Sequence, residues 1–164
     1  MHTFFHSAAA AALLACALGT AHASDPKATI ADLDARLAKI GAPKLDGTEK
    51  AGDKTVPALF FGERKINNNY DVVDAIRKAH DATATLFVKD GDEFVRVSTN
   101  VLTAEGKRGV GTQLARNAAY EAVSKGQQFC GPIDVLGTAF DACYNPIKDG
   151  GGKIIGVSYI GHKK

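Results

Sequence analysis

The spacing of apolar residues changes from a helical to a strand-like period along the chain. Near the amino-terminal end, apolar side chains recur every three or four positions, at Ile30, Leu33, Leu37 and Ile40. This spacing predicts an amphipathic helix over residues 26–40, with Asp25 as its N-cap and Gly41 at its end. A second helix is predicted over residues 71–80. Residues 44–70, between the helices, are rich in turn-forming residues and are expected to be irregular.

From residue 83 onward, β-branched and aromatic residues dominate short segments, which is typical of strands. The predicted strands are residues 83–89, 93–100, 127–135, 138–148 and 153–161, and a short helix is predicted over residues 115–125. Turn sequences such as Asp90-Gly91-Asp92 link neighbouring strands, so we expect a mostly antiparallel sheet. Because the helices come mainly before the strands, the sequence predicts an α+β domain, with a five-stranded sheet and its long N-terminal helix packed on one face.

The first residues have the pattern of a signal peptide. Residues 1–23 contain no Lys, Arg, Asp or Glu, and they end in Ala21-His22-Ala23, whose small side chains suit signal peptidase. We predict cleavage after Ala23, which leaves residues 24–164 as a single domain in the periplasm or outside the cell. Two alternatives stay open, namely a lipoprotein box with acylation of Cys16 and a buried N-terminal helix.

Composition narrows the class of protein. The 164 residues include 20 Lys and Arg against 18 Asp and Glu, and the formal charge of +2 leaves no basic excess for nucleic acid. The histidines that remain after cleavage, His80 and His162, have no metal-ligand spacing with each other or with the cysteines. No catalytic or cofactor motif is recognisable. We therefore expect no metal, no cofactor and no enzymatic activity.

The two cysteines after the signal, Cys130 and Cys143, fall in the predicted strands 127–135 and 138–148. A two-residue turn at Leu136-Gly137 would place them directly opposite each other in an antiparallel hairpin. Disulfides persist outside the cytoplasm, so we expect a disulfide between them. The alternative is a pair of reduced, partly buried thiols.

The strand region resembles a known family. The run from Ala84 to Val101 is similar to the core of the extracytoplasmic Cache domains of bacterial chemoreceptors, in the Cache type 3 and type 2 fusion class. The similarity continues through Arg108 to Thr112, Tyr144 to Ile147 and Gly152 to Val157, and it covers about residues 28–162. It implies a PAS-like fold that binds small molecules and passes a signal to attached helices.

Two features differ from the family receptors. Those receptors flank the domain with transmembrane helices and a cytoplasmic signalling region, whereas this sequence starts with a signal peptide and stops at Lys164. We therefore expect a stand-alone module with a membrane receptor or kinase as its partner. In addition, Cys130 and Cys143 stand where the related receptors usually have aromatic and polar or basic residues.

Arg96 is the first candidate for ligand binding. It lies in an otherwise apolar strand, where a guanidinium is costly without a partner and suits a carboxylate. An ion pair with an Asp and simple solvent exposure are the alternatives. By two-residue alternation, Ser98 shares its face and Thr99 does not. Asp141 and Tyr144 are further ligand-binding candidates, and Tyr144 could instead pack in the core or at its rim.

These observations favour one function over a second. The first is a secreted sensor-type domain that binds a small polar ligand, such as an organic acid, and that can form a homodimer. The second is a structural or protein-interaction module that keeps the fold and binds no ligand. Neither includes nucleic acid as a partner.

Overall fold

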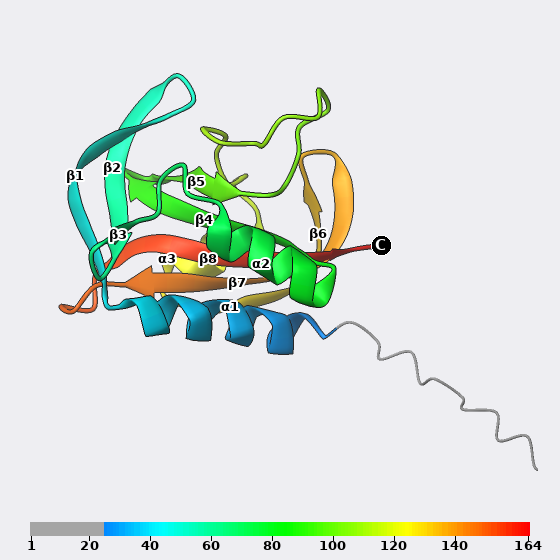
Figure 1. Ribbon diagram of the computed structural model, residues 1–164. Coiled ribbons are helices and arrows are strands. Elements are labelled where there is room, and N and C mark those ends of the chain that lie inside the picture. Colours follow the sequence, from blue (N-terminus) through cyan, green and yellow to red (C-terminus); the bar gives the residue numbers. More distant parts are fainter. Residues whose placement is uncertain (1–24) are drawn as a thin grey trace, which may run out of the picture.

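The computed structural model describes residues 25–164 (Figure 1). The predicted signal peptide, its cleavage site after Ala23 and the alternative acylation site Cys16 lie outside the described residues. The helices are α1 (Pro26–Ile40), α2 (Asp71–His80) and α3 (Ala118–Ser124). The strands are β1 (Pro43–Ala51), β2 (Lys54–Phe61), β3 (Arg64–Lys65), β4 (Thr83–Asp90), β5 (Glu93–Thr99), β6 (Phe129–Val135), β7 (Thr138–Lys148) and β8 (Ile154–Lys163).

The long helix α1 has the predicted bounds. The Asp25 side chain accepts a hydrogen bond from the backbone N–H of Lys27 and so caps the first turn. The buried apolar residues of this helix are Ile30, Leu33 and Leu37. The chain then turns at Gly41, where an added Cβ would stand 2.5 Å from the Cα of Gly62. This close approach of two glycines holds the end of α1 against the β2–β3 turn.

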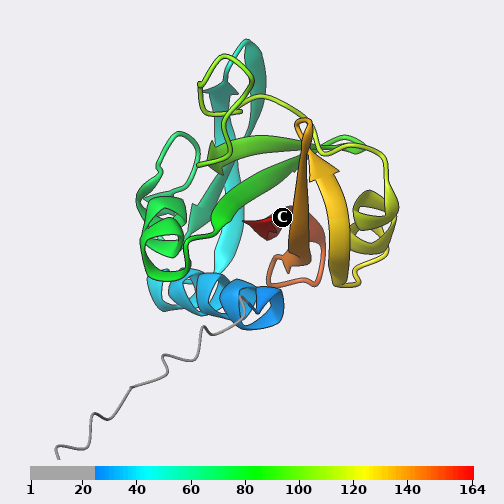
Figure 2. The same cartoon turned by 90° about the vertical axis from the view of Figure 1, so that its right-hand side faces the viewer.

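Five strands form one antiparallel sheet in the spatial order β5-β4-β8-β7-β6, which confirms the predicted α+β class (Figure 2). The last strand, β8, lies in the middle of the sheet, hydrogen-bonded to β4 on one side and β7 on the other. The carboxyl-terminal segment is therefore tied into the core of the fold rather than added at an edge.

The hairpin of β6 and β7 has the predicted register, and its disulfide is confirmed. Cys130 and Cys143 are directly opposite each other, with their Cα atoms 4.2 Å apart, and a disulfide joins them. The two-residue turn is formed by Leu136 and Gly137, whose φ angles are 51° and 83°. Positive φ at both positions belongs to the turn type that matches the twist of paired strands.

The expectation that residues 44–70 are irregular is wrong. β1 and β2 pair as an antiparallel hairpin, and β3 adds a third, short strand to this small sheet. Nearly all side chains of β1 are partly or fully exposed, so the strand needs no alternation of apolar and polar residues. Its register also shifts between Leu45 and Thr48. β2 ends in the apolar run Leu59-Phe60-Phe61, of which Leu59 and Phe61 are buried.

Both faces of the five-stranded sheet are covered, and we name them by what covers them. The helix face packs against α1, α2 and the small sheet. Its core includes Leu33, Leu37, Val73, Ile76, Leu86, Val95 and Ile160. The loop face is covered by α3 and the segment of residues 100–117, with α3 on the far side from α1 and α2 (Figure 2). Its core includes Phe87, Phe94, Val101, Leu114, Val123, Phe140, Tyr144 and Tyr159.

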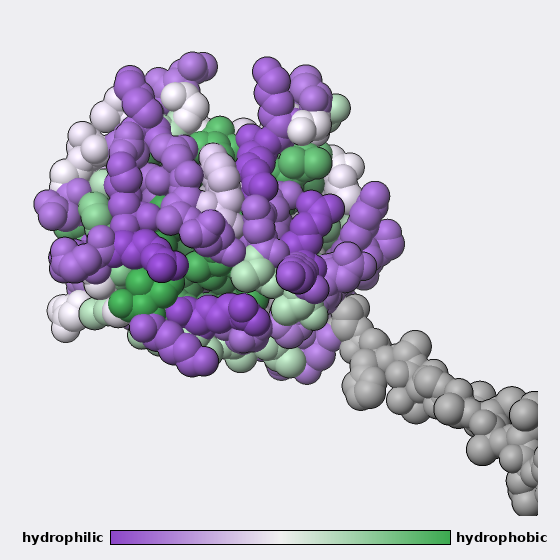
Figure 3. All heavy atoms as spheres, viewed as in Figure 1, coloured by the Kyte–Doolittle hydropathy of each residue, from purple (hydrophilic) through white to green (hydrophobic). Residues whose placement is uncertain are grey.

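The outer surface over α1 and α2 is mostly hydrophilic, and apolar side chains show mainly in the seam between the two helices (Figure 3). Ile40 of α1 and Val72 of α2 are partly buried, pack on the core and line the groove between the two helices. An amphipathic helix keeps its polar face toward water in this way. The helix-face core is thus closed over by α1 and α2.

We expect the substitution Leu136→Asn to stabilise the protein. Leu136 is 40% exposed and adopts φ 51°, a conformation that costs a branched side chain about 1 kcal/mol and that Asn tolerates. The midpoint of thermal unfolding should rise by about 4 °C. Leu136→Ala is the matched control, since it removes the exposed apolar group but keeps the unfavourable φ. Equal gains from Asn and Ala would contradict this explanation.

Candidate functional site

Arg96 is a buried cation without an acidic partner. Its residue is 3% exposed, and it forms no ion pair within residues 25–164. Its Nη1 donates to Thr112 Oγ1 at 2.9 Å and to the backbone oxygen of Gln113 at 3.1 Å, and the guanidinium lies 4.8 Å from the ring centre of Phe87. Its buried Nε–H has no acceptor in the described part of the chain. Burial lowers the pKa of Arg96, yet a guanidinium stays charged.

The strand around Arg96 is held from both sides. On one side β5 pairs with β4. On the other side it pairs with the end of the segment of residues 100–117, which we call the covering segment. These bonds run from Arg96 N to Thr112 O and from Gly111 N to Arg96 O. A third bond of this kind joins the backbone N–H of Leu114 to Phe94 O. The covering segment therefore closes the outer edge of β5 and carries two of the acceptors for the guanidinium.

Two buried tyrosines lie beside Arg96 on the loop face. The rings of Tyr144 and Tyr159 are 4.8 Å apart. Burial raises the pKa of Tyr159 to about 12 and raises that of Tyr144 as well, while the charge of Arg96 acts on both in the opposite direction. The Tyr159 hydroxyl shares a hydrogen bond of 3.1 Å with Thr83 Oγ1. The Tyr144 side chain is buried as well, with the residue 1% exposed.

The structure brings together two of the four predicted ligand-binding residues. Arg96 and Tyr144 lie on the loop face, since Arg96 pairs with Phe87 and Tyr144 pairs with Tyr159. Asp141 is exposed and alternates with Tyr144 along β7, so it belongs to the helix face.

Ser98 does not share a face with Arg96, which corrects the expectation from strict alternation. The register of β4 and β5 shifts between Leu86 and Phe87: Phe87 is opposite Arg96, and Leu86 is opposite Ser98. Val97 is the extra residue of this β-bulge. Ser98 consequently turns to the helix face, where its hydroxyl donates to the backbone oxygen of Asn69 at 2.6 Å.

Sequence reasoning missed several polar residues of the loop face. Thr99 moves to this face because of the bulge, and its Oγ1 lies 2.6 Å from Thr85 Oγ1. Tyr159 lies opposite Thr85 in the sheet, in the final strand β8, and was not recognised as a candidate. Alternation within each strand could have placed Thr85 and Tyr159 on one face, but only the spatial order of β4 and β8 shows that they are neighbours.

A polar groove opens at the end of the sheet near these residues. This cavity of about 520 Å³ is lined by Arg77, His80, Thr83, Phe140, His162 and Lys163, with Asp81 as an acidic residue among them. A smaller cavity of about 160 Å³ shares Arg77, Thr83, Phe140 and Lys163 with the groove and reaches the loop-face core at Val101 and Val135. A Cβ at Gly161 would overlap the Tyr159 hydroxyl and stand 3.1 Å from Phe140. The groove therefore reaches the hydroxyl end of Tyr159, whose ring packs against Tyr144.

The two histidines of the described chain meet in the polar groove. Burial lowers the pKa of His162 below its ordinary 6.5, and His80 acts in the same direction. The acids that act against this shift are Asp25, Asp81 and Asp141. No three His, Cys, Asp or Glu side chains within residues 25–164 are grouped as metal ligands.

We expect the free energy of unfolding to decrease as the pH falls through the titration of His162. The unfolded chain binds this proton more tightly than the folded protein does, because the folded-state pKa is lowered. The contribution of neutral His162 is therefore complete well above pH 6.5 and is lost as the pH falls from 6.5 to the lowered folded-state pKa. Urea unfolding at several pH values should show this slope in the wild-type protein and a smaller slope in His162→Gln. Equal slopes would assign the dependence to another group.

The antiparallel sheet with α1 packed on one face, and with a short helix and a long segment closing the other, has the architecture of a PAS-like domain. The family model of the Cache 3/Cache 2 fusion domain matches residues 27–164, and the chain belongs to this family. The resemblance inferred from the sequence is thus confirmed.

No curated protein and no solved structure matches the chain. None of the helices within residues 25–164 is long and apolar enough to cross a membrane. Domains of this family are extracytoplasmic and commonly bind small molecules. The buried Arg96 without an acidic partner makes the loop face the candidate ligand site.

Proposed function

We propose that the domain binds a small organic acid on the loop face of its sheet, with Arg96 receiving the carboxylate. The buried, unpaired guanidinium is the observation that carries this proposal. Burying a charge is costly unless it is paired, and a ligand carboxylate would supply the missing partner. The Nε–H without an acceptor belongs to the fork of donors that a carboxylate binds with two parallel hydrogen bonds.

Two tyrosines and a threonine pair support the same site. The Tyr144 hydroxyl would donate to the second oxygen of the carboxylate or to another polar group of the acid. The rings of Tyr144 and Tyr159 form an apolar wall for the carbon atoms of the ligand. Thr85 and Thr99 add hydroxyls on the same face. The proposed contacts leave out Ser98 and Asp141, which lie on the helix face.

The polar groove is the proposed entrance. Thr83 lines the groove and is hydrogen-bonded to Tyr159, so a path from the groove to Arg96 passes these two residues and Phe140. Arg77 and Lys163 line the groove and form no ion pair within residues 25–164. Cationic side chains around an opening raise the local concentration of anions, which favours acids over amines at this entrance.

The proposed cellular role combines the family with the predicted signal peptide. The chain would be exported by its signal peptide, cleaved after Ala23, and would act in the periplasm or outside the cell as a stand-alone binding module. A membrane receptor or kinase would then recognise the ligand-loaded form, alone or as a homodimer. The proposal contains no catalytic step and no cofactor.

Thermal unfolding in a ligand panel tests the proposal. The panel contains short monocarboxylates and dicarboxylates, amino acids, and the primary amide of each acid as a neutral control. A ligand that binds only the folded state stabilises it by about 2.7 kcal/mol at 100 times its Kd. We expect at least one acid to raise the unfolding midpoint with increasing concentration, and its amide to have no effect. No response across the panel would favour the second function, a module that keeps the Cache fold without a ligand.

A further inference from the structure

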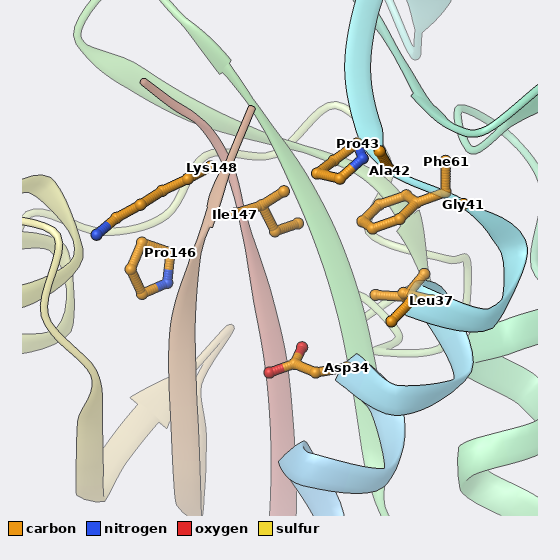
Figure 4. A pocket seen from close by; sticks show the side chains of 10 residues that line it. Asp34, Leu37, Gly41, Ala42, Pro43, Phe61, Pro146, Ile147 and Lys148 are labelled. Atoms are coloured by element: carbon orange, nitrogen blue, oxygen red, sulfur yellow. The ribbon is translucent and has the colours of Figure 1, made fainter. Parts of the chain in front are cut away.

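A second cavity lies on the helix face, on the opposite side of the sheet from Arg96. It has a volume of about 350 Å³ and opens between the carboxyl-terminal half of α1 and the end of β7 (Figure 4). Its walls are mostly apolar, formed by Leu37, Ala38, Phe61, Pro146 and Ile147. This volume falls within the range of known small-molecule sites.

One carboxylate, that of Asp34, lines the cavity among these apolar side chains. Asp34 Oδ1 accepts a hydrogen bond of 2.6 Å from Ser158 Oγ, and Oδ2 accepts one of 2.6 Å from Asn145 Nδ2. Both donors are neutral, and Asp34 forms no ion pair within residues 25–164. A carboxylate has about four acceptor positions, so each oxygen retains capacity for a further donor.

The second charged residue at the cavity does not neutralise Asp34. Figure 4 shows the Lys148 side chain extending away from Asp34. Its Nζ lies beside Gly126, 3.3 Å from where a Cβ on that residue would stand. The charge that faces the apolar walls is therefore negative.

We propose that this cavity binds a small amine with an apolar body. The ammonium group would donate to the oxygens of Asp34, and the hydrocarbon part would lie against Leu37, Phe61 and Ile147. Phe61 also offers an aromatic ring, which attracts cations. An acid would be repelled by Asp34, and a neutral apolar molecule would leave the carboxylate without a cation. This site is separate from the proposed acid site in its position, its charge and its ligand.

The test uses benzylamine, which is protonated at neutral pH, with benzyl alcohol and benzoate as probes of the same shape. Titrations followed by two-dimensional NMR should show saturable shifts for benzylamine at residues that line the cavity. We expect benzylamine to bind at least tenfold more tightly than benzyl alcohol, and benzoate to cause no saturable shift there. Equal binding of the amine and the alcohol would overturn recognition by Asp34.

Three variants test whether benzylamine binds in this cavity. Asp34→Asn removes the charge and should weaken benzylamine binding at least tenfold. Ala38→Phe keeps the charge but fills the cavity, and it should cause a similar loss. Asp53→Asn is the matched control, since it removes one negative charge in the exposed β1–β2 turn and should leave binding unchanged. If both cavity variants retain wild-type affinity, the proposal is wrong.

The two sites can be tested independently. Arg96→Met should leave benzylamine binding unchanged, because Arg96 is on the other face of the sheet. Loss of amine binding in this variant would contradict the separation of the two sites. Absence of acid binding with intact amine binding would contradict only the proposed function.

Discussion

The Arg96→Met variant should lose acid binding while the ligand-free protein stays nearly as stable as the wild type. Removing a desolvated charge that pairs with a ligand costs about 2 kcal/mol or more, a loss of at least about 30-fold in affinity. The ligand-free protein loses two hydrogen bonds, to Thr112 Oγ1 and Gln113 O. It also loses a buried charge that has no acidic partner, and replacing such a charge with an apolar side chain of similar length is often neutral. We expect the free energy of unfolding to change by less than about 1 kcal/mol.

Calorimetric titration with the acid identified by thermal unfolding measures the first effect, and urea unfolding without ligand measures the second. Arg96→Lys is a matched variant that keeps the charge and loses the fork of donors, so its affinity should fall between those of the wild type and Arg96→Met. Unchanged affinity in Arg96→Met would contradict the site. A loss of more than about 3 kcal/mol in ligand-free stability would make Arg96 a structural residue instead.

Removing the disulfide should have the largest effect on stability. Cys130 and Cys143 are separated by 13 positions, and a cross-link that closes a loop of this size stabilises a protein by about 3 kcal/mol. β6 is an edge strand that pairs with β7 alone within the five-stranded sheet. The cross-link therefore holds in place the strand that has a single neighbour. For the double substitution of both cysteines by Ala, we expect the unfolding midpoint to fall by about 10 °C.

Thiol reduction provides the control for this prediction. A reducing agent should lower the unfolding midpoint of the wild-type protein by the same amount and have no effect on the double Ala variant. A decrease of less than about 1 kcal/mol in the free energy of unfolding would show that the hairpin is held without the cross-link.

Where a strong local signal exists, the sequence predicts the fold well. Four apolar residues on one face of α1 and the cap at Asp25 define a helix with the observed bounds. The Leu136-Gly137 turn sets the register of β6 and β7 and therefore the pairing of the cysteines. Turn chemistry and periodicity act over a few residues, so they can be recognised without knowledge of the packing.

The features that the sequence did not predict depend on contacts between distant segments. β1 is nearly all exposed or half-exposed, so it carries no strand pattern of its own and forms through pairing with β2. The bulge at Val97 turns Ser98 away from Arg96 and brings Thr99 to its face. Nothing in the sequence of β5 marks this extra residue. The sequence therefore named Arg96 and Tyr144 as candidates but not Tyr159, which packs against Tyr144 from β8.

The most direct test of the acid site is the side-chain Nε–H signal of Arg96 in ¹H–¹⁵N NMR spectra. This signal can be assigned by its loss in Arg96→Lys. In the ligand-free protein the proton has no acceptor within residues 25–164. When the stabilising acid is added, we predict a downfield shift of the signal and slower exchange of the proton with water. An acid that raises the unfolding midpoint and leaves this signal unchanged would contradict carboxylate binding at Arg96.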